Sequence, residues 1–115
     1  MERKRVAVVT GGGSGIGRGI ALRLSEAGMH VVPADISKSA SEETLSLLRE
    51  KGGTGTASEI DVTDNASVTA EFSRLVEELG GIDVVVNSAG IGKKDWVWGI
   101  PEETWDRVMS INLKG

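Results

Sequence analysis

The chain has 115 residues, enough for one small domain, and its composition excludes several classes of protein. It contains no cysteine, which excludes disulfides, thiolate metal sites and a cysteine nucleophile and fits a reducing cytoplasm. A net charge of −4, from 13 Lys and Arg against 17 Asp and Glu, offers no footprint for nucleic acid. No apolar run approaches the roughly 20 residues that span a bilayer, and the first residues make a poor secretory signal. We therefore expect a cytoplasmic protein with neither nucleic acid nor a membrane as partner.

Short apolar strands alternate with helical patterns from the start of the chain. Val6 to Val9 is a β-branched run that ends at glycines and predicts a buried parallel strand. A helix is expected from Gly15, with Gly28 as its stop. His30 to Asp35 predicts a second strand, in which Pro33 is placed near a fraying end because proline cannot donate to a ladder.

The alternation continues through the middle of the chain. Ser39 and Glu42 form a capping-box pattern, which predicts the start of a second helix that ends at the glycines 52–53. Thr56 to Val62 is a weak third strand. Asp64 is expected to cap a third helix. The apolar stripe of that helix consists of Val68, Phe72, Leu75, Val76 and Leu79.

The last part of the chain completes the pattern. Ile82 to Asn87 predicts a fourth, buried strand, and a last helix is expected to open at Pro101 and to carry Asn112. Strands that alternate with helices imply a parallel sheet with right-handed crossovers. We predict an α/β fold of the Rossmann type over residues 1–115, with helices on both faces of a parallel sheet of strand order 3-2-1-4.

The turn between the first strand and the first helix, "TGGGSGIG" from Thr10 to Gly17, is rich in glycine. The first amide groups of a helix lack internal partners, and glycine lets a phosphate approach the backbone closely. The spacing G-x-G-x-x-G fits no register here, and the P-loop pattern fails because Arg18-Gly19 follows in place of Lys and a hydroxyl residue. The spacing that fits is T-G-x-x-x-G-x-G. The turn therefore predicts a phosphate site, with a merely flexible turn as the alternative.

Four motifs together resemble the short-chain dehydrogenase/reductase family over essentially the whole chain. They are the glycine turn, "DV" at Asp61-Val62, "NSAG" at 87–90 and "NLKG" at 112–115. The resemblance implies transfer of a hydride between a small-molecule substrate, a secondary alcohol or its ketone, and a nicotinamide dinucleotide. The residues that it assigns to the cofactor are Gly11, Ser14, Gly15, Ile16, Gly17, Asp61, Val62, Asn87, Ala89 and Gly90.

Asp35 closes the second predicted strand, 18 residues past Gly17. A carboxylate at this point can accept hydrogen bonds from both hydroxyls of the adenosine ribose and would repel a 2′-phosphate. Arg18 and Lys38 are the nearest cations and are displaced from the positions that favour NADP in the family. We therefore expect NAD to be preferred over NADP. The alternative is that Asp35 only caps the following turn.

The resemblance gives two further residues a role and leaves one contact open. Asp61 would bond the adenine amino group, although a helix-capping role is the alternative. Asn112 matches the asparagine of the family's catalytic tetrad and would hold a water beside the catalytic lysine; an ordinary buried asparagine is the alternative. Ser88 stands where the family usually has a second asparagine, so it retains a hydroxyl and loses an amide. No metal site is expected.

The sequence contains no tyrosine, so the family's catalytic Tyr-x-x-x-Lys motif is absent. We expect the chain to be the N-terminal, NAD-binding part of a longer enzyme and to be inactive alone. We also expect a bare edge on the fourth strand. An isolated chain is expected to be marginally stable, to associate, or to be part of a longer protein, and the full protein is expected to be a homo-oligomer, dimer or tetramer. The alternatives are a dinucleotide-binding module without catalysis and, less favoured by the motifs, a flavodoxin-like FMN or phospho-receiver domain.

Overall fold

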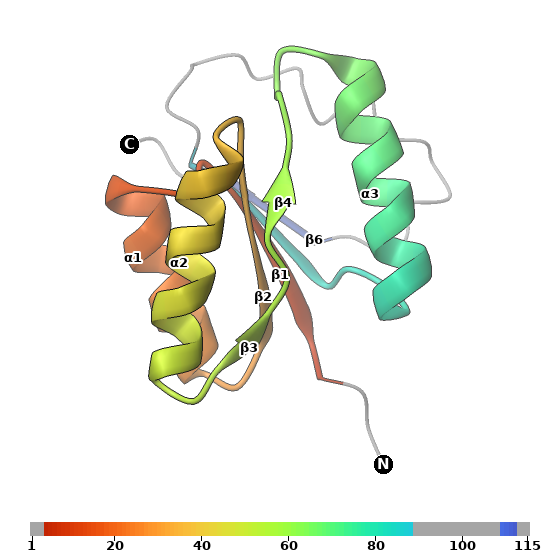
Figure 1. The fold of residues 1–115 in the computed structure, drawn as a ribbon. Helices are drawn as coiled ribbons and strands as arrows, with labels where there is room; N and C mark the ends of the chain where they lie inside the picture. The colour runs from red at the N-terminus through yellow and green to blue at the C-terminus, as the bar shows by residue number, and fades with distance from the viewer. Residues whose placement is uncertain (1–3, 89–108, 113–115) are drawn as a thin grey trace.

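The structure of the protein is a computed structural model that describes residues 4–88 and 109–112. Parallel strands form one sheet in the order β3-β2-β1-β5-β6, and β4 also pairs with β2 (Figure 1). The strands are β1 (Val6–Thr10), β2 (His30–Asp35), β3 (Thr54–Gly55), β4 (Ser58–Glu59), β5 (Val84–Asn87) and β6 (Met109–Asn112). The helices are α1 (Gly15–Glu26), α2 (Lys38–Glu50) and α3 (Asn65–Leu79). The predicted Rossmann-type order 3-2-1-4 is confirmed, with β6 added beside the fourth strand.

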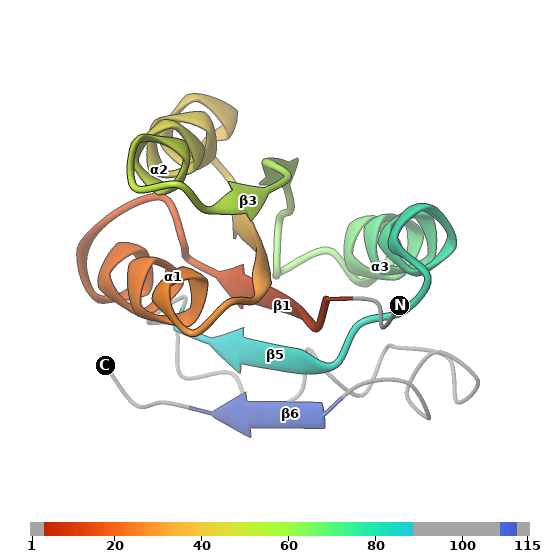
Figure 2. The same cartoon turned by 90° about the horizontal axis from the view of Figure 1, so that it is seen from below.

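The helices cover both faces of the sheet, as predicted (Figure 2). Alternate residues of a strand point to opposite faces, so β1 contributes to two separate cores. Val6 and Val8 pack in a cluster with Phe72 and Leu75 of α3. Ala7 and Val9 pack in a second cluster, which includes buried residues of α1 and α2. All five residues of β1 are buried, which explains why Val6 to Val9 form a continuous apolar run.

The helix ends follow local signals, with one correction. The Asp64 side chain accepts hydrogen bonds from the first amides of α3, as predicted. Gly80 ends that helix with a φ of 82°. The predicted cap Ser39 is wrong: the hydroxyl of Ser37 accepts from the Ala40 amide and starts α2 two residues earlier. None of the helices in the described ranges is long and apolar enough to cross a membrane.

The predicted third strand, Thr56 to Val62, is replaced by two short strands that both pair with β2. Pro33 explains the interruption. The backbone oxygens of Val31 and Asp35 accept bonds from this neighbouring segment, so the intervening Pro33 nitrogen faces the same side and has no hydrogen to donate. On its other side Pro33 is paired with Val9 in the middle of a buried strand, rather than at a fraying end as we expected.

The expectation of a helix that carries Asn112 is wrong for residues 109–112. This segment is β6, which pairs in parallel with β5 from Val84↔Met109 to Asn87↔Asn112. The expected bare edge of the fourth strand is therefore also wrong. An unpaired strand edge exposes a row of backbone donors and acceptors, and β6 satisfies those of β5. The local signal at Pro101, on which the helix prediction rested, did not outweigh this pairing.

Candidate functional site

The carboxyl ends of the central strands form one row at an edge of the sheet. Thr10 of β1 is in register with Ala34 of β2 on one side and with Asn87 of β5 on the other. The chain order reverses at this place, because β2 follows β1 on one side while β5 and β6 lie on the other (Figure 1). Parallel α/β sheets bind ligands in the crevice outside such a switch point.

The glycine turn that leaves β1 lies close to neighbouring backbone. Gly11 and Gly15 have φ values of 70° and 56°, a region that favours glycine. A Cβ on Gly17 would overlap the Gly11 carbonyl oxygen and would come within 2.6 Å of the Ser88 hydroxyl. Glycine at these positions thus lets α1 begin directly against the ends of β1 and β5.

The start of α1 presents amides without partners. Among the residues that the structure describes, the amides of Ser14, Gly15 and Ile16 find no acceptor, and Ser14 makes no capping bond with its side chain. The first turn of α1 contains no acidic residue that would compete for these donors. Unpaired amides and the positive end of the helix dipole suit an anion such as a diphosphate.

Asp35 is bound to the glycine turn. Its Oδ2 accepts from the Gly13 amide at 3.0 Å, and its Oδ1 accepts from the Ser37 amide at 3.0 Å. The alternative of a turn-capping aspartate is therefore part of the observed geometry. A carboxylate has about four acceptor positions, so two remain for a second role toward a ligand.

Thr10, Asn87 and Ser88 join the ends of β1 and β5. The Thr10 hydroxyl donates to the side-chain oxygen of Asn87 at 3.1 Å. Both the hydroxyl and the amide of Ser88 donate to the Thr10 carbonyl oxygen, at 2.8 and 3.2 Å. The serine that departs from the family pattern thus still contributes a bond across the switch point.

Asp61 lies just beyond β4, which pairs with the carboxyl end of β2. The Thr63 hydroxyl donates to its Oδ1 at 2.6 Å and the Thr63 amide at 3.0 Å. These two bonds lower the pKa of Asp61, the hydroxyl bond most. Capping of α3 belongs to Asp64, so the capping alternative for Asp61 is not supported. Val62 is half-buried against the core cluster of α3.

The site also has exposed apolar side chains, and some of its predicted residues lie outside the described ranges. Ile36, which follows Asp35, is 66% exposed, and Ile16 is 60% exposed. The signal for Ile36 in the sequence is that an apolar residue directly follows the acidic end of the strand. Ala89 and Gly90 lie outside the described residues, and for Asn112 only the backbone position opposite Asn87 is described. No cluster of three metal-binding side chains occurs within the described ranges.

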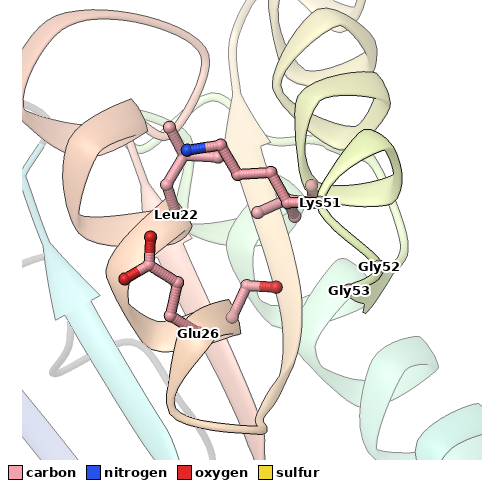
Figure 3. Close-up of a pocket in the computed structure, with 7 residues that line it drawn as sticks. Leu22, Glu26, Lys51, Gly52 and Gly53 are labelled. Carbon is pink, nitrogen blue, oxygen red and sulfur yellow. The ribbon is translucent and has the colours of Figure 1, made fainter.

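A separate hollow of about 370 Å³ lies between α1 and α2 (Figure 3). Leu22 and Glu26 of α1 and Lys51 to Gly53 after α2 line it, and the Lys51 side chain extends from the end of α2 toward α1. These residues lie in the C-terminal half of α1 and just beyond the end of α2, whereas the glycine turn precedes α1. The hollow is therefore distinct from the candidate site, and its mixed, open lining defines no ligand chemistry.

The parallel sheet, its switch point, the glycine turn and the acidic end of β2 define a nucleotide-binding fold of the Rossmann type. The family model for short chain dehydrogenases matches residues 5–115. The chain belongs to the short-chain dehydrogenase/reductase family.

Individual relatives agree with this assignment. An uncharacterized oxidoreductase of Thermotoga maritima is 44% identical over 115 residues, which cover 100% of this chain and 45% of that protein. A 3-oxoacyl-acyl-carrier-protein reductase, FabG, of Staphylococcus aureus is 38% identical over 116 residues, or 100% of this chain and 47% of that protein. The structure of a citronellol catabolism dehydrogenase of Pseudomonas aeruginosa matches with a TM-score of 0.80 at 26% identity, over 96% of this chain and 55% of that one. The chain spans a little under half the length of these curated relatives.

Proposed function

We propose that this chain is the NAD-binding part of an oxidoreductase that transfers a hydride between a secondary alcohol or its ketone and nicotinamide. The observation that carries the proposal is the juxtaposition of the unpaired amides at the start of α1 with the Asp35 carboxylate, which bonds the same glycine turn. Family membership supports it, because members of this family are oxidoreductases that use nicotinamide cofactors.

The residues fit the two polar parts of a dinucleotide. The amides of Ser14, Gly15 and Ile16 would donate to the diphosphate, and the Ser14 hydroxyl is available for the same oxygens. Asp35 would accept from the ribose hydroxyls with its remaining lone pairs. The exposed side chains of Ile16 and Ile36 would be covered by apolar parts of the ligand.

The charges near Asp35 favour NAD over NADP. The Arg18 guanidinium donates to the Gly13 carbonyl oxygen and is paired with Glu43 at 3.3 Å, so its charge is already engaged. A 2′-phosphate beside Asp35 would meet a carboxylate, and the Arg18 guanidinium is already bonded to Gly13 and Glu43. NAD has a hydroxyl at that position, which can donate to the carboxylate.

When bound, the nicotinamide ring would accept or release the hydride. The described residues contribute binding and orientation: the start of α1 holds the diphosphate and Asp35 holds the ribose. Proton transfer to or from the substrate oxygen needs an acid or base, which the family supplies with the tyrosine of Tyr-x-x-x-Lys. In this proposal that group lies in the remainder of a longer protein, as would the catalytic partners of Asn112.

The test is a titration of NADH and NADPH by fluorescence, with wild type and Asp35→Ala. We expect wild type to bind NADH more tightly than NADPH. In Asp35→Ala we expect the difference between the two affinities to be smaller. Glu50→Gln is the control, because it also removes one negative charge. Glu50 is the last residue of α2, about 18 Å from the start of α2, which follows Asp35. An unchanged preference in Asp35→Ala would overturn the assignment of the ribose contact, and failure of wild type to bind either dinucleotide would overturn the function.

The second candidate is a dinucleotide-binding module without catalysis. The absence of tyrosine from the sequence favours it for the chain alone. It predicts NADH binding with no turnover of secondary alcohols. An enzyme that contains the rest of the family's motifs would instead oxidise secondary alcohols and reduce NAD to NADH. An absorbance assay for NADH formation on the full protein, beside the titration, separates the two.

We also propose a cytoplasmic location and a homo-oligomeric full protein. The absence of cysteine supports a reducing compartment. Light scattering after size exclusion tests the assembly, and a monomer at micromolar concentration would contradict it.

A further inference from the structure

Two side chains on different helices hold the carbonyl groups of the glycine turn. Thr44 lies in the middle of α2 and is fully buried, and its hydroxyl donates to the Gly12 carbonyl oxygen at 2.8 Å. Arg18 lies near the start of α1, and its Nη2 donates to the Gly13 carbonyl oxygen at 2.6 Å. The Arg18 Nε also donates to the Thr44 hydroxyl oxygen at 3.0 Å. We call Thr44 and Arg18 the α2 latch.

The directions of these bonds are fixed by chemistry. A guanidinium only donates and a carbonyl oxygen only accepts, so the Thr44 hydroxyl must accept from Arg18 and give its proton to Gly12. Thr44 is thus the middle member of a chain of bonds from α1 through α2 to the turn. A buried hydroxyl with both its donor and its acceptor role satisfied is a specific contact rather than incidental packing.

The latch fixes the planes of two successive peptide groups. In a trans peptide the carbonyl and the amide point in opposite directions. The peptide between Gly12 and Gly13 is held at both ends, by Thr44 at its oxygen and by Asp35 at its amide, 3.0 Å away. In the next peptide the oxygen is held by Arg18, so the Ser14 amide points away from the guanidinium, unpaired within the described part of the chain.

We propose that Thr44 and Arg18 are positioning residues, which preset the backbone orientation that the diphosphate requires and make dinucleotide affinity depend on α2. The inference rests on the proposed function. Consecutive glycines have wide conformational freedom, so a turn without the latch would sample other peptide orientations. The ligand would then have to order the turn on binding, which weakens affinity.

The matched pair of variants is Thr44→Val and Thr44→Ser. Valine keeps the shape of threonine and removes the hydroxyl, whereas serine keeps the hydroxyl. In isothermal titration of the full protein, Thr44→Val is expected to weaken binding of both NADH and ADP about five- to tenfold, the equivalent of one lost hydrogen bond. Thr44→Ser is expected to restore most of that affinity. Arg18→Met combined with Thr44→Val should cost less than the sum of the single effects, because the bonds form one chain.

Ser41→Ala controls for a merely structural role. Ser41 is a fully buried hydroxyl of the same helix, but it donates to the Lys38 carbonyl oxygen and holds no atom of the turn. This variant should lower the melting temperature without changing either dissociation constant. If Ser41→Ala weakens binding as much as Thr44→Val does, the positioning role is overturned.

Hydrogen exchange of the Gly13 amide gives a readout that needs no ligand. This amide is bonded to Asp35, and we expect it to exchange faster in Thr44→Val than in wild type or Ser41→Ala. Wild type that binds neither NADH nor ADP would overturn the proposed function, while the exchange rates would still test the latch. Equal affinities and equal Gly13 exchange in wild type and Thr44→Val would overturn the latch and leave the proposed function standing.

Discussion

The Thr10 hydroxyl donates to the side-chain oxygen of Asn87 across the boundary between β1 and β5, at 3.1 Å. The two residues are register partners at the carboxyl ends of parallel strands. The bond therefore joins the strand that leads into the glycine turn to the strand that leads into the "NSAG" motif at 87–90. It also satisfies a hydroxyl that is only 1% exposed.

Thr10→Val should destabilise the fold by about 1 kcal/mol, because it removes this donor while it keeps the shape. A double-mutant cycle with Asn87→Ala, measured by urea unfolding, is expected to give a coupling energy of about 0.5–1.5 kcal/mol. Strictly additive effects of the two substitutions would show that the bond contributes nothing to stability.

Two glycines of α1 should respond in opposite directions to alanine. Gly17→Ala places a Cβ into the Gly11 carbonyl and should destabilise by about 1–3 kcal/mol. Gly19→Ala adds a Cβ in open space and should stabilise the helix by about 0.5–1 kcal/mol. Thermal unfolding of both variants measures the difference. A neutral Gly17→Ala would mean that α1 can move away from the ends of β1 and β5.

Two helix caps should also behave differently. Asp64→Ala should cost about 1 kcal/mol because it removes the acceptor for two amides of α3, while Asp64→Asn keeps an acceptor there and should cost less. Ser14 makes no capping bond, so Ser14→Ala should change stability by less than about 0.5 kcal/mol and should weaken NADH binding instead. A large loss of stability with unchanged NADH affinity would assign Ser14 to the fold rather than to the ligand.

His30 should make stability depend on pH. Its ring nitrogens lie 3.1 and 3.0 Å from the hydroxyls of Thr54 and Thr56. Burial lowers the pKa of His30, and the nearby charge of Lys4 lowers it further. As the pH falls through about 6.5, the unfolded chain therefore takes up this proton before the folded chain does, and the free energy of unfolding falls. Above that pH the contribution of His30 is complete.

Urea unfolding between about pH 7.5 and about pH 5.5 measures this dependence. His30→Gln keeps a polar group that can reach a threonine hydroxyl, and it should flatten the profile in that range. Lys4→Gln should flatten it partly, because it removes the second cause of the shift. A wild-type profile that is already flat would contradict the lowered pKa.

The parts of the fold that were predicted from the sequence have local causes. The apolar run of β1 and the cap at Asp64 each act within a few neighbouring residues. The interruption between β3 and β4 has a different cause, because it depends on which neighbour Pro33 faces, and this is known only when the register is known. The same is true of β6, whose pairing with β5 outweighs a short helical pattern.

The candidate site was predicted in part for the same reason. The glycine turn is recognisable because it follows a strand, and Asp35 because it ends one. In the structure the two are joined by the hydrogen bond from the Gly13 amide to Asp35. Thr44 gave no signal, because a threonine inside a helix looks ordinary and its partner Gly12 lies 32 residues away in the sequence. Contacts of this length are set by how α2 packs on the sheet, which no local pattern encodes.

The alternation of β1 between two cores also has a bearing on how insertions and deletions would act. A slip of one residue along β1 would turn Val6 and Val8 toward α1 and α2 and would send Ala7 and Val9 toward α3, leaving voids on one face and overcrowding on the other. The same slip would displace the glycine turn by about 3.3 Å, the rise of one strand residue. The packing of β1 in the two cores thus fixes how far the glycine turn lies from the interior of the domain.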